Sequence, residues 1–157
     1  MPINEKLTAT DIAEALLEIT GDALVSGDFE AFVAVFHVPQ YMATLAGPIY
    51  METHEDMSRA FAEMHGYFRD NGITRLNREV TKANYVSDLK ISFTHVSTTM
   101  RGSRQIKGPY PVFSVIEWID GTWKVTGSEY VLEPDSEQAK ALAHADVSAR
   151  GQRNSED

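Results

Sequence analysis

Two titratable side chains lie inside segments that are otherwise apolar or hydroxyl-rich. Glu117 interrupts the run from Phe113 to Ile119. A carboxyl group in a dry cavity has a raised pKa and can act as a general acid or base. His95 lies in the hydroxyl-rich segment 92–99, and histidine is the side chain that titrates near neutral pH without perturbation. We therefore predict that His95 and Glu117 are catalytic residues.

Each of these residues also has a structural interpretation. Asp120-Gly121 predicts a two-residue hairpin turn, because both turn positions need a positive φ. That turn places Glu117 opposite Lys124, and such a cross-strand ion pair contributes about 0.2–1 kcal/mol. His95 can instead form hydrogen bonds with neighbouring serine and threonine hydroxyls. The sequence leaves both alternatives open.

A second set of residues is predicted to line a binding site for a small apolar ligand. They are aromatic, sulfur-containing or hydroxyl side chains, with one histidine, on or beside the predicted strands and helices: His37, Tyr41, Met42, Thr44, Tyr67, Phe113, Ser128 and Tyr130. Tyr130 has a phenol that can donate to a carbonyl or enolate. For each residue, packing in the core or at its rim is the alternative.

The sequence indicates no metal and no cofactor. His54-Glu55 begins like a zinc-protease motif, but Ser58 occupies the position of the second histidine. The chain contains no cysteine, which excludes disulfides, thiolate nucleophiles and zinc–thiolate sites. Residues 102–108 lack the spacing and the helix of a phosphate-binding loop.

Composition narrows the classes of partner. With 157 residues the chain fits one domain, and a net charge of −9 disfavours nucleic acids and anionic membranes. Residues 1–10 contain no apolar leader, and no apolar run is long enough to span a membrane. We expect a cytoplasmic protein.

The first half of the chain predicts helices. A helix capped by Thr10 or Asp11 and ended by Gly27 has apolar residues with a period of 3.6, namely Ile12, Ala15, Leu16, Ile19 and Ala23. Asp28 is predicted to cap a short helix that Pro39 ends. A short strand over 41–46 follows.

The clearest element is a helix that begins at Thr53 and ends at Asn71-Gly72. Thr53 and Asp56 resemble a capping box, and the apolar stripe consists of Met57, Ala60, Phe61, Met64 and Phe68.

The second half predicts an antiparallel meander. Residues 73–86, 89–101, 110–119 and 122–132 are rich in β-branched and aromatic side chains, and 102–108 is a longer connection. Helices followed by such strands indicate an α+β domain over residues 1–132. Residues 133–157 are predicted to form an extension, a short helix and then a polar tail.

Three segments give this pattern a family resemblance: Ser26-Gly27-Asp28-Phe29-Glu30-Ala31-Phe32, the helix from Thr53, and Asp120-Gly121-Thr122-Trp123-Lys124-Val125. Over residues 8–132 the chain resembles the nuclear transport factor 2-like superfamily, which includes the SnoaL-like cyclases and ketosteroid isomerase. The resemblance implies a cone-shaped, curved antiparallel sheet wrapped around a long helix, with two N-terminal helices. It also implies a ligand cavity and a homodimer formed through the convex face of the sheet.

The functional residues of the isomerase branch are not matched. Thr44 stands near the position of its base Asp, Thr20 near its oxyanion Tyr, and Val115 near its oxyanion Asp. The resemblance directs Phe113, Glu117, Ser128 and Tyr130 towards the cavity. Amphipathicity favours the opposite face, with Val112, Ser114, Ile116, Trp118, Trp123, Val125 and Val131. We predict, as the resemblance implies, that the face with Phe113, Glu117, Ser128 and Tyr130 lines the cavity.

We therefore predict a small-molecule-binding domain with an apolar cavity. Two alternatives are a cofactor-independent lyase or isomerase acting on a hydrophobic molecule, and a non-catalytic dimeric interaction module. The enzyme needs two titratable groups within about 6–7 Å of each other. Binding of a drug-sized ligand needs a cavity of roughly 300 Å³ or more.

Overall fold

The computed structural model describes residues 7–44 and 47–130 of the chain. The elements follow in the order α1 (Ala9–Ser26), α2 (Phe29–Val33), β1 (Phe36–Thr44), β2 (Gly47–Met51), α3 (His54–Asp70), β3 (Arg75–Ser87), β4 (Lys90–Arg101), β5 (Arg104–Ile119) and β6 (Thr122–Tyr130). The predicted extension at 133–157 lies outside the described residues. No helix in the described part of the chain is long and apolar enough to cross a membrane.

Helix α1 begins earlier than the sequence predicted. Thr8 is the N-cap, and its hydroxyl accepts a hydrogen bond from the Asp11 amide, so neither Thr10 nor Asp11 is the cap. The helix ends at Gly27 with φ at 83°, as expected. Its buried side is Ala9, Ile12, Ala13, Leu16, Leu17, Thr20, Ala23 and Leu24, whereas the predicted Ala15 and Ile19 face solvent. The buried side of α1 therefore includes a polar residue, Thr20, that the predicted apolar stripe does not contain.

The segment after α1 leaves helical geometry sooner than expected. Asp28 caps α2 through the Ala31 amide, as predicted, but the helix ends at Val33. Strand β1 already begins at Phe36 and continues through Pro39. Parallel pairing with β6 explains the change, because the Val125 amide donates to the Val35 carbonyl and Phe36 lies opposite Val125. Tertiary pairing overrides the local helical pattern here.

Helix α3 matches its prediction in full. Thr53 and Asp56 form a reciprocal capping box, and Asn71 is the C-cap. All five predicted apolar residues are buried. His65 of this helix also bonds through Nδ1 to the Leu24 carbonyl at 2.8 Å, which ties α3 to the end of α1.

The six strands form one mixed sheet in the order β2-β1-β6-β5-β4-β3. Every neighbouring pair is antiparallel except β1 and β6, which refines the predicted antiparallel sheet. The expected connection over 102–108 is wrong, since β5 begins at Arg104 and a tight turn at Gly102, with φ at 59°, joins it to β4. The hairpin at Asp120-Gly121 is confirmed, with both φ angles positive.

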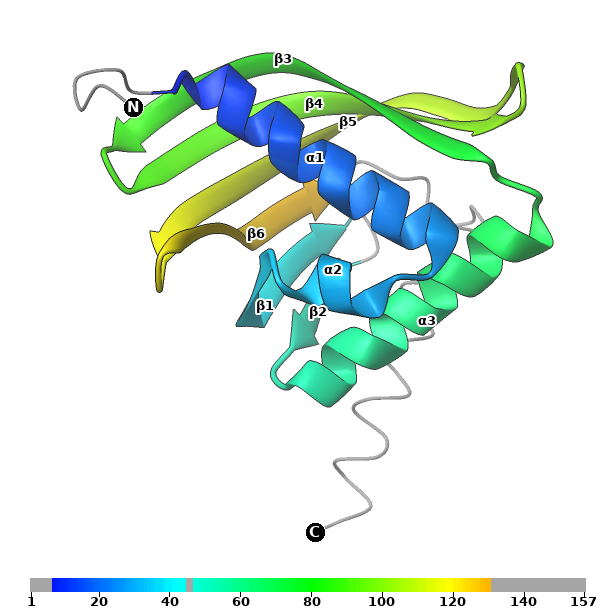
Figure 1. Cartoon of the computed structure of the whole chain (residues 1–157), viewed down its shortest axis with the longest axis horizontal. Coiled ribbons are helices and arrows are strands. Elements are labelled where there is room, and N and C mark those ends of the chain that lie inside the picture. Colours follow the sequence, from blue (N-terminus) through cyan, green and yellow to red (C-terminus); the bar gives the residue numbers. More distant parts are fainter. Residues whose placement is uncertain (1–6, 45–46, 131–157) are drawn as a thin grey trace, which may run out of the picture.

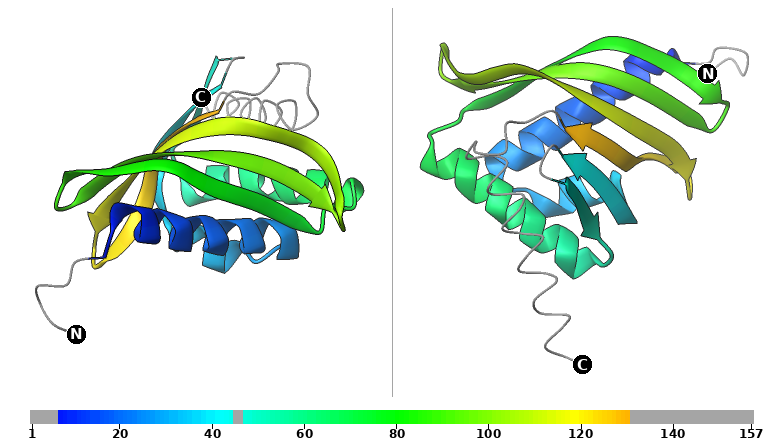
Figure 2. Two further views of the ribbon diagram at one scale, coloured as in Figure 1. Left: turned by 90° about the horizontal axis from the view of Figure 1, so that it is seen from above. Right: turned by 180° about the vertical axis from the view of Figure 1, so that it is seen from behind.

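The helices occupy different parts of this curved sheet. Helix α1 packs against β3 and β4, whereas α3 packs against α1, α2 and β2. Figures 1 and 2 show α1 lying along the β3–β4 side and α3 towards the β1–β2 end. The α+β architecture of the prediction is confirmed, and its interior lies between the sheet and two helices of similar length.

Candidate functional site

The inner face of the sheet carries the buried side chains of β4 and β5. On β4 these are Ile91, Phe93, His95, Ser97 and Thr99, and on β5 they are Tyr110, Val112, Ser114 and Ile116. Amphipathicity therefore identified the inner face of β5 correctly, and the face suggested by the resemblance is wrong for this strand. Phe113, which lies on that other face, is 41% exposed.

A bulge in β6 changes which residues of that strand face inward. Val115 lies opposite Gly127 and Ile116 opposite Val125, so Thr126 has no register partner. Beyond the bulge Ser128 pairs with Ser114, and its side chain is buried. A regular alternation along 122–132 had assigned Ser128 to the face of Glu117. The extra residue explains the difference, because one inserted residue inverts the side-chain alternation.

His95 and Glu117 are not brought together. His95 is 2% exposed on the inner face, whereas Glu117 alternates with the buried Ile116 and lies on the outer face, half-buried. The predicted catalytic pair is therefore wrong. Glu117 lies opposite Lys90 on one side and Lys124 on the other. Among the described residues, however, no ion pair within 4.0 Å joins it to either lysine.

His95 is buried without the hydrogen bonds that a structural histidine would form. Neither ring nitrogen has a partner among the described residues, and Phe93 lies 5.8 Å away, ring centre to ring centre. Burial, together with the nearby positive charge of Arg78, lowers the pKa of His95 to about 3. The imidazole is thus neutral at physiological pH and offers one N–H donor and one lone pair.

The side chains around His95 form a small cavity, here called the polar lobe. It is lined by five polar and five apolar residues: Thr20, Arg78, His95, Ser114, Ser128, Leu16, Leu17, Phe36, Phe93 and Val125. Its volume is about 20 Å³. Arg78 donates to the Thr20 hydroxyl at 2.6 Å, and that hydroxyl donates to the Leu17 carbonyl. Ser114 and Ser128 lie 3.4 Å apart, oxygen to oxygen. The polar side chains of the lobe therefore come from α1 and from strands β3, β4, β5 and β6.

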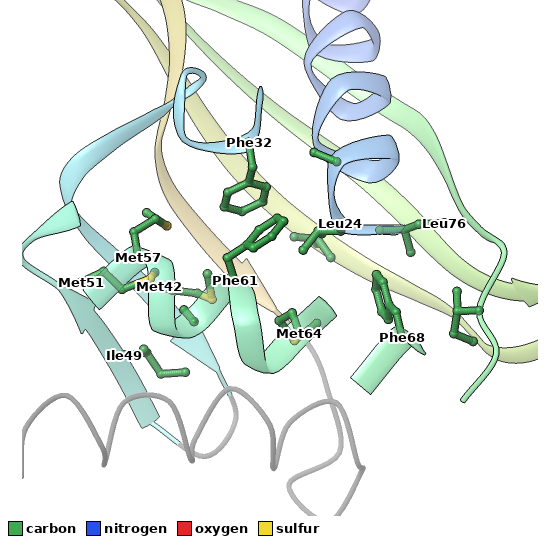
Figure 3. Close-up of a cluster of buried hydrophobic side chains, with 14 of the residues drawn as sticks. Leu24, Phe32, Met42, Ile49, Met51, Met57, Phe61, Met64, Phe68 and Leu76 are labelled. Atoms are coloured by element: carbon green, nitrogen blue, oxygen red, sulfur yellow. The ribbon is translucent and has the colours of Figure 1, made fainter. Parts of the chain in front are cut away.

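A second cavity, here called the apolar lobe, adjoins it. Its lining is dominated by four methionines and four phenylalanines: Met42, Met51, Met57, Met64, Phe32, Phe36, Phe61 and Phe68. Figure 3 shows the four methionines and Phe32, Phe61 and Phe68 converging from α2, α3, β1 and β2. The volume is about 50 Å³, and the side chains of Phe36 and Arg78 line both lobes. Phe32 stacks on Phe36 at a centroid distance of 4.2 Å.

The remaining predicted ligand-binding residues are distributed over the molecule. Met42 lines the apolar lobe and Ser128 the polar lobe. Tyr41 is 45% exposed and contacts Tyr50, its opposite on β2. Tyr67 is half-buried beside Phe68.

His37 lies outside both lobes, in a surface groove that His54, Asp120 and Lys124 also line. Thr44 and Tyr130 end neighbouring strands and lie opposite each other, but their side chains lie outside the described ones.

Arg78 and Gln40 are interior polar residues that were not predicted from the sequence. Arg78 lines both lobes. Its alternation with the inward Leu76 was the available signal, because residues two apart share a face of a strand. Gln40 shares a face with Met42 in the same way, is 3% exposed, and donates from Nε2 to the Val125 carbonyl at 2.7 Å. Its Oε1 has no partner among the described residues.

The described residues offer no metal site, since no three histidine, aspartate or glutamate side chains among them are grouped to hold an ion. Together, the two lobes combine a large hydrocarbon and thioether surface with a few uncharged hydrogen-bonding groups and one guanidinium. That arrangement is suited to holding a small molecule by shape and by one polar contact.

No protein-family model and no curated protein matches the sequence. Solved structures do resemble it. A Nostoc punctiforme protein of unknown function with a cystatin-like fold is 17% identical with a TM-score of 0.61, covering 83% of this chain and 97% of that one. An NTF-2-like protein of unknown function from Shewanella oneidensis is 14% identical with a TM-score of 0.59, covering 80% and 100%.

A candidate dehydratase of the NTF2-like family from Streptomyces avermitilis is 12% identical with a TM-score of 0.57, covering 79% of this chain and 96% of that one. At such identities the likeness concerns the arrangement of helices and strands. The chain therefore has the nuclear transport factor 2-like fold that its sequence resemblance implied.

Proposed function

We propose that this domain binds a small, largely apolar molecule in the space between its sheet and its two long helices. One observation carries the proposal. His95 is 2% exposed, and both of its ring nitrogens lack a partner among the described residues while facing a cavity. A buried polar group left unsatisfied costs about 1–3 kcal/mol, and a ligand that bonds to it would offset this cost.

The apolar lobe supports the same function. Methionine side chains are flexible and polarisable, so they adapt to ligands of different shape. The described lobes are smaller than the roughly 300 Å³ expected for a drug-sized ligand. At these side-chain positions the site fits a molecule of ring size, and a larger one would require the methionines to repack.

The catalytic alternative has less support than binding. General acid–base catalysis by a lyase or isomerase needs a group that gives or takes a proton at the reacting atom. A histidine with a pKa of about 3 is a weak base, and no carboxylate is among the described side chains that line the two lobes. The lobes therefore favour holding a molecule over transforming it.

A thermal-shift screen of the full chain against small apolar metabolites tests the proposal, with hits checked by calorimetry. We expect hits that raise the melting temperature and compete with one another for one site. His95→Phe should change the affinity for such hits, whereas the same substitution at the exposed His54 should not. If no compound binds, the proposed function fails and the interaction-module alternative gains. If both variants bind like the original chain, the molecule binds away from His95.

We also propose that two copies associate through the outer face of the sheet. Tyr41 and Phe113 are 45% and 41% exposed on this face, and the half-buried Val96 and Val115 lie there as well. Exposed aromatic residues are enriched at interfaces. Light scattering coupled to size exclusion should give a dimer mass for the full chain and a monomer mass for Phe113→Lys. A monomer before substitution would refute the pairing.

A further inference from the structure

The two lobes differ in chemistry, and the difference points to a class of ligand. We infer that the site takes an uncharged, ring-sized molecule with one hydroxyl group, a small phenol or cyclic alcohol, whose hydroxyl bonds to His95. Its hydrocarbon part lies among the methionines and phenylalanines. The inference rests on the proposed function, and it adds the size, the charge and the orientation of the bound molecule.

Size is the first argument. A water molecule needs about 10–15 Å³ of such space, so the 20 Å³ of the polar lobe fits one oxygen-sized group. The apolar lobe, with about 50 Å³, has room for about four water-sized volumes. A molecule that fills both lobes thus has one polar group attached to a compact hydrocarbon body. Because Phe36 lies between the lobes, its ring must move slightly aside to admit such a molecule.

Hydrogen-bonding capacity is the second argument. A neutral imidazole presents one donor and one acceptor, and the Oε1 atom of Gln40 is a further acceptor. A hydroxyl both donates and accepts, so it can bond to a ring nitrogen of His95 in either tautomer. A carboxylate only accepts, so it cannot donate to the Oε1 atom of Gln40 or to the lone pair of His95, and the Arg78 guanidinium that lines the lobes is already bonded to the Thr20 hydroxyl. The unpartnered atoms of these two residues therefore match an alcohol better than an acid.

The lining of the apolar lobe indicates the shape of the hydrocarbon part. Phe32 and Phe61 lie at a centroid distance of 4.9 Å and a tilt of 54°, and Phe36 stacks beside them. Aromatic rings pack favourably against one another in tilted and offset geometries, and against methionine sulfur. A flat ring is thus a better partner for this lining than a flexible chain.

Three matched probes test the class on the full chain: 4-methylphenol, toluene and benzoate, each titrated by calorimetry. We expect 4-methylphenol to bind about tenfold more tightly than toluene, as one hydrogen bond to a buried group allows. Benzoate should bind no better than toluene. In protein labelled with 15N at histidine, 4-methylphenol should shift the His95 ring resonances and leave those of the exposed His54 unchanged.

Two pairs of variants locate the contacts. His95→Phe should reduce the preference for 4-methylphenol over toluene to about twofold or less, whereas His54→Phe should keep it. Ala60→Leu fills the apolar lobe, which Ala60 lines, and should abolish binding of both probes. Ala62→Leu, on the exposed side of the same helix, should not. A melting curve confirms that each variant is folded.

The outcomes separate the inference from the proposed function. Equal or tighter binding of benzoate or toluene overturns the hydroxyl class while leaving a small-molecule site in place. Retention of the preference in His95→Phe overturns the assigned orientation. If none of the three probes binds, the ligand class is refuted. The proposed function fails only if the broader metabolite screen also gives no hit.

Discussion

The two halves of the interior are built from different side chains. Under α3 the buried cluster is rich in methionine and phenylalanine, including Met57, Phe61 and Phe68. Under α1 the cluster consists mainly of alanine, leucine and β-branched residues, such as Ala13, Leu16 and Ile91, around the polar lobe. Methionine has three rotatable bonds and fills irregular space, whereas β-branched side chains are restricted at χ1.

This difference separates two tasks of a binding site. A restrained cluster holds a polar group such as His95 at a fixed position. In an adaptable cluster the methionine side chains can change rotamer to fit the hydrocarbon part of a ligand. The comparison predicts that truncating a buried side chain destabilises the protein more in the cluster under α1 than in the cluster under α3. Four measurements follow, ordered from the largest expected effect to the smallest.

Matched leucine truncations compare the two sides directly. Both leucines are on helix α1 and are almost fully buried. Leu16, 5% exposed, belongs to the cluster under α1, whereas Leu24, 6% exposed, belongs to the methionine-rich cluster under α3. Because the cost of a cavity depends on how well its walls collapse, Leu16→Ala should lower the free energy of unfolding by about 4–5 kcal/mol and Leu24→Ala by about 2–3 kcal/mol.

Urea denaturation at pH 7.5 measures both variants. Leu89→Ala is the control, since Leu89 is 58% exposed and its truncation should stay within about 0.5 kcal/mol. Equal losses at Leu16 and Leu24 would remove the proposed contrast in adaptability.

Acid should expose the cost of burying His95 on the α1 side. Its pKa is about 3 in the folded chain, against 6.5 for an unperturbed histidine, so below pH 6.5 the unfolded chain binds a proton that the native chain does not. Above pH 6.5 His95 is neutral in both states, and stability is lost as the pH falls from 6.5 towards 3. The loss amounts to about 1.4 kcal/mol per pH unit in that window.

The measurement compares the original chain with His95→Phe by urea denaturation at pH 7.5, 5.5 and 4.5. The other four histidines are present in both proteins, so their titration cancels in the difference. We expect the original chain to lose roughly 3 kcal/mol more than the variant between pH 7.5 and 4.5. Parallel curves would show that His95 acquires a partner in solution that accepts its charge.

At neutral pH two histidines should respond in opposite directions to the same substitution. His65 bonds to the Leu24 carbonyl, so His65→Phe should lower the free energy of unfolding by about 1 kcal/mol. His95 has no such partner among the described residues, and removing its unsatisfied nitrogens in His95→Phe should raise stability by about 1–2 kcal/mol. A loss at both sites would mean that His95 is satisfied in the native protein.

The smallest expected effect concerns the caps of the two long helices. Thr53 belongs to a reciprocal capping box on α3, whereas Thr8 accepts a single hydrogen bond on α1. Thr53→Ala should destabilise by about 1–2 kcal/mol and Thr8→Ala by about 0.5–1 kcal/mol. Thermal denaturation of both variants at one pH gives the order. A larger loss at Thr8 would indicate that α1 depends on its own ends more than α3 does.

Local chemistry in the sequence was enough to predict several elements. The Asp120-Gly121 turn, the end of α1 at Gly27 and the capping box at Thr53 all depend on residues within a few positions of one another. The buried stripe of α3 was also predicted correctly, because a helix of many turns repeats its signal. These are features whose energetics are local, and the α+β order of the chain followed from them.

Only the tertiary structure decided the candidate site. A single extra residue at Thr126 inverted the alternation of β6 and placed Ser128 beside Ser114. Parallel pairing with β6 made a strand of a segment predicted as helix. Arg78 faces inward because α1 crosses its strand and offers Thr20 as an acceptor.

The sequence alone therefore determined the fold class, the end of α1 at Gly27, both ends of α3 and the Asp120-Gly121 turn. It named His95 but joined it to Glu117, a residue on the other face of the sheet. Which side chains share a cavity depends on strand register and on contacts between distant segments. A shift of one residue changes the face on which a side chain lies, and the local sequence of either strand does not encode that register.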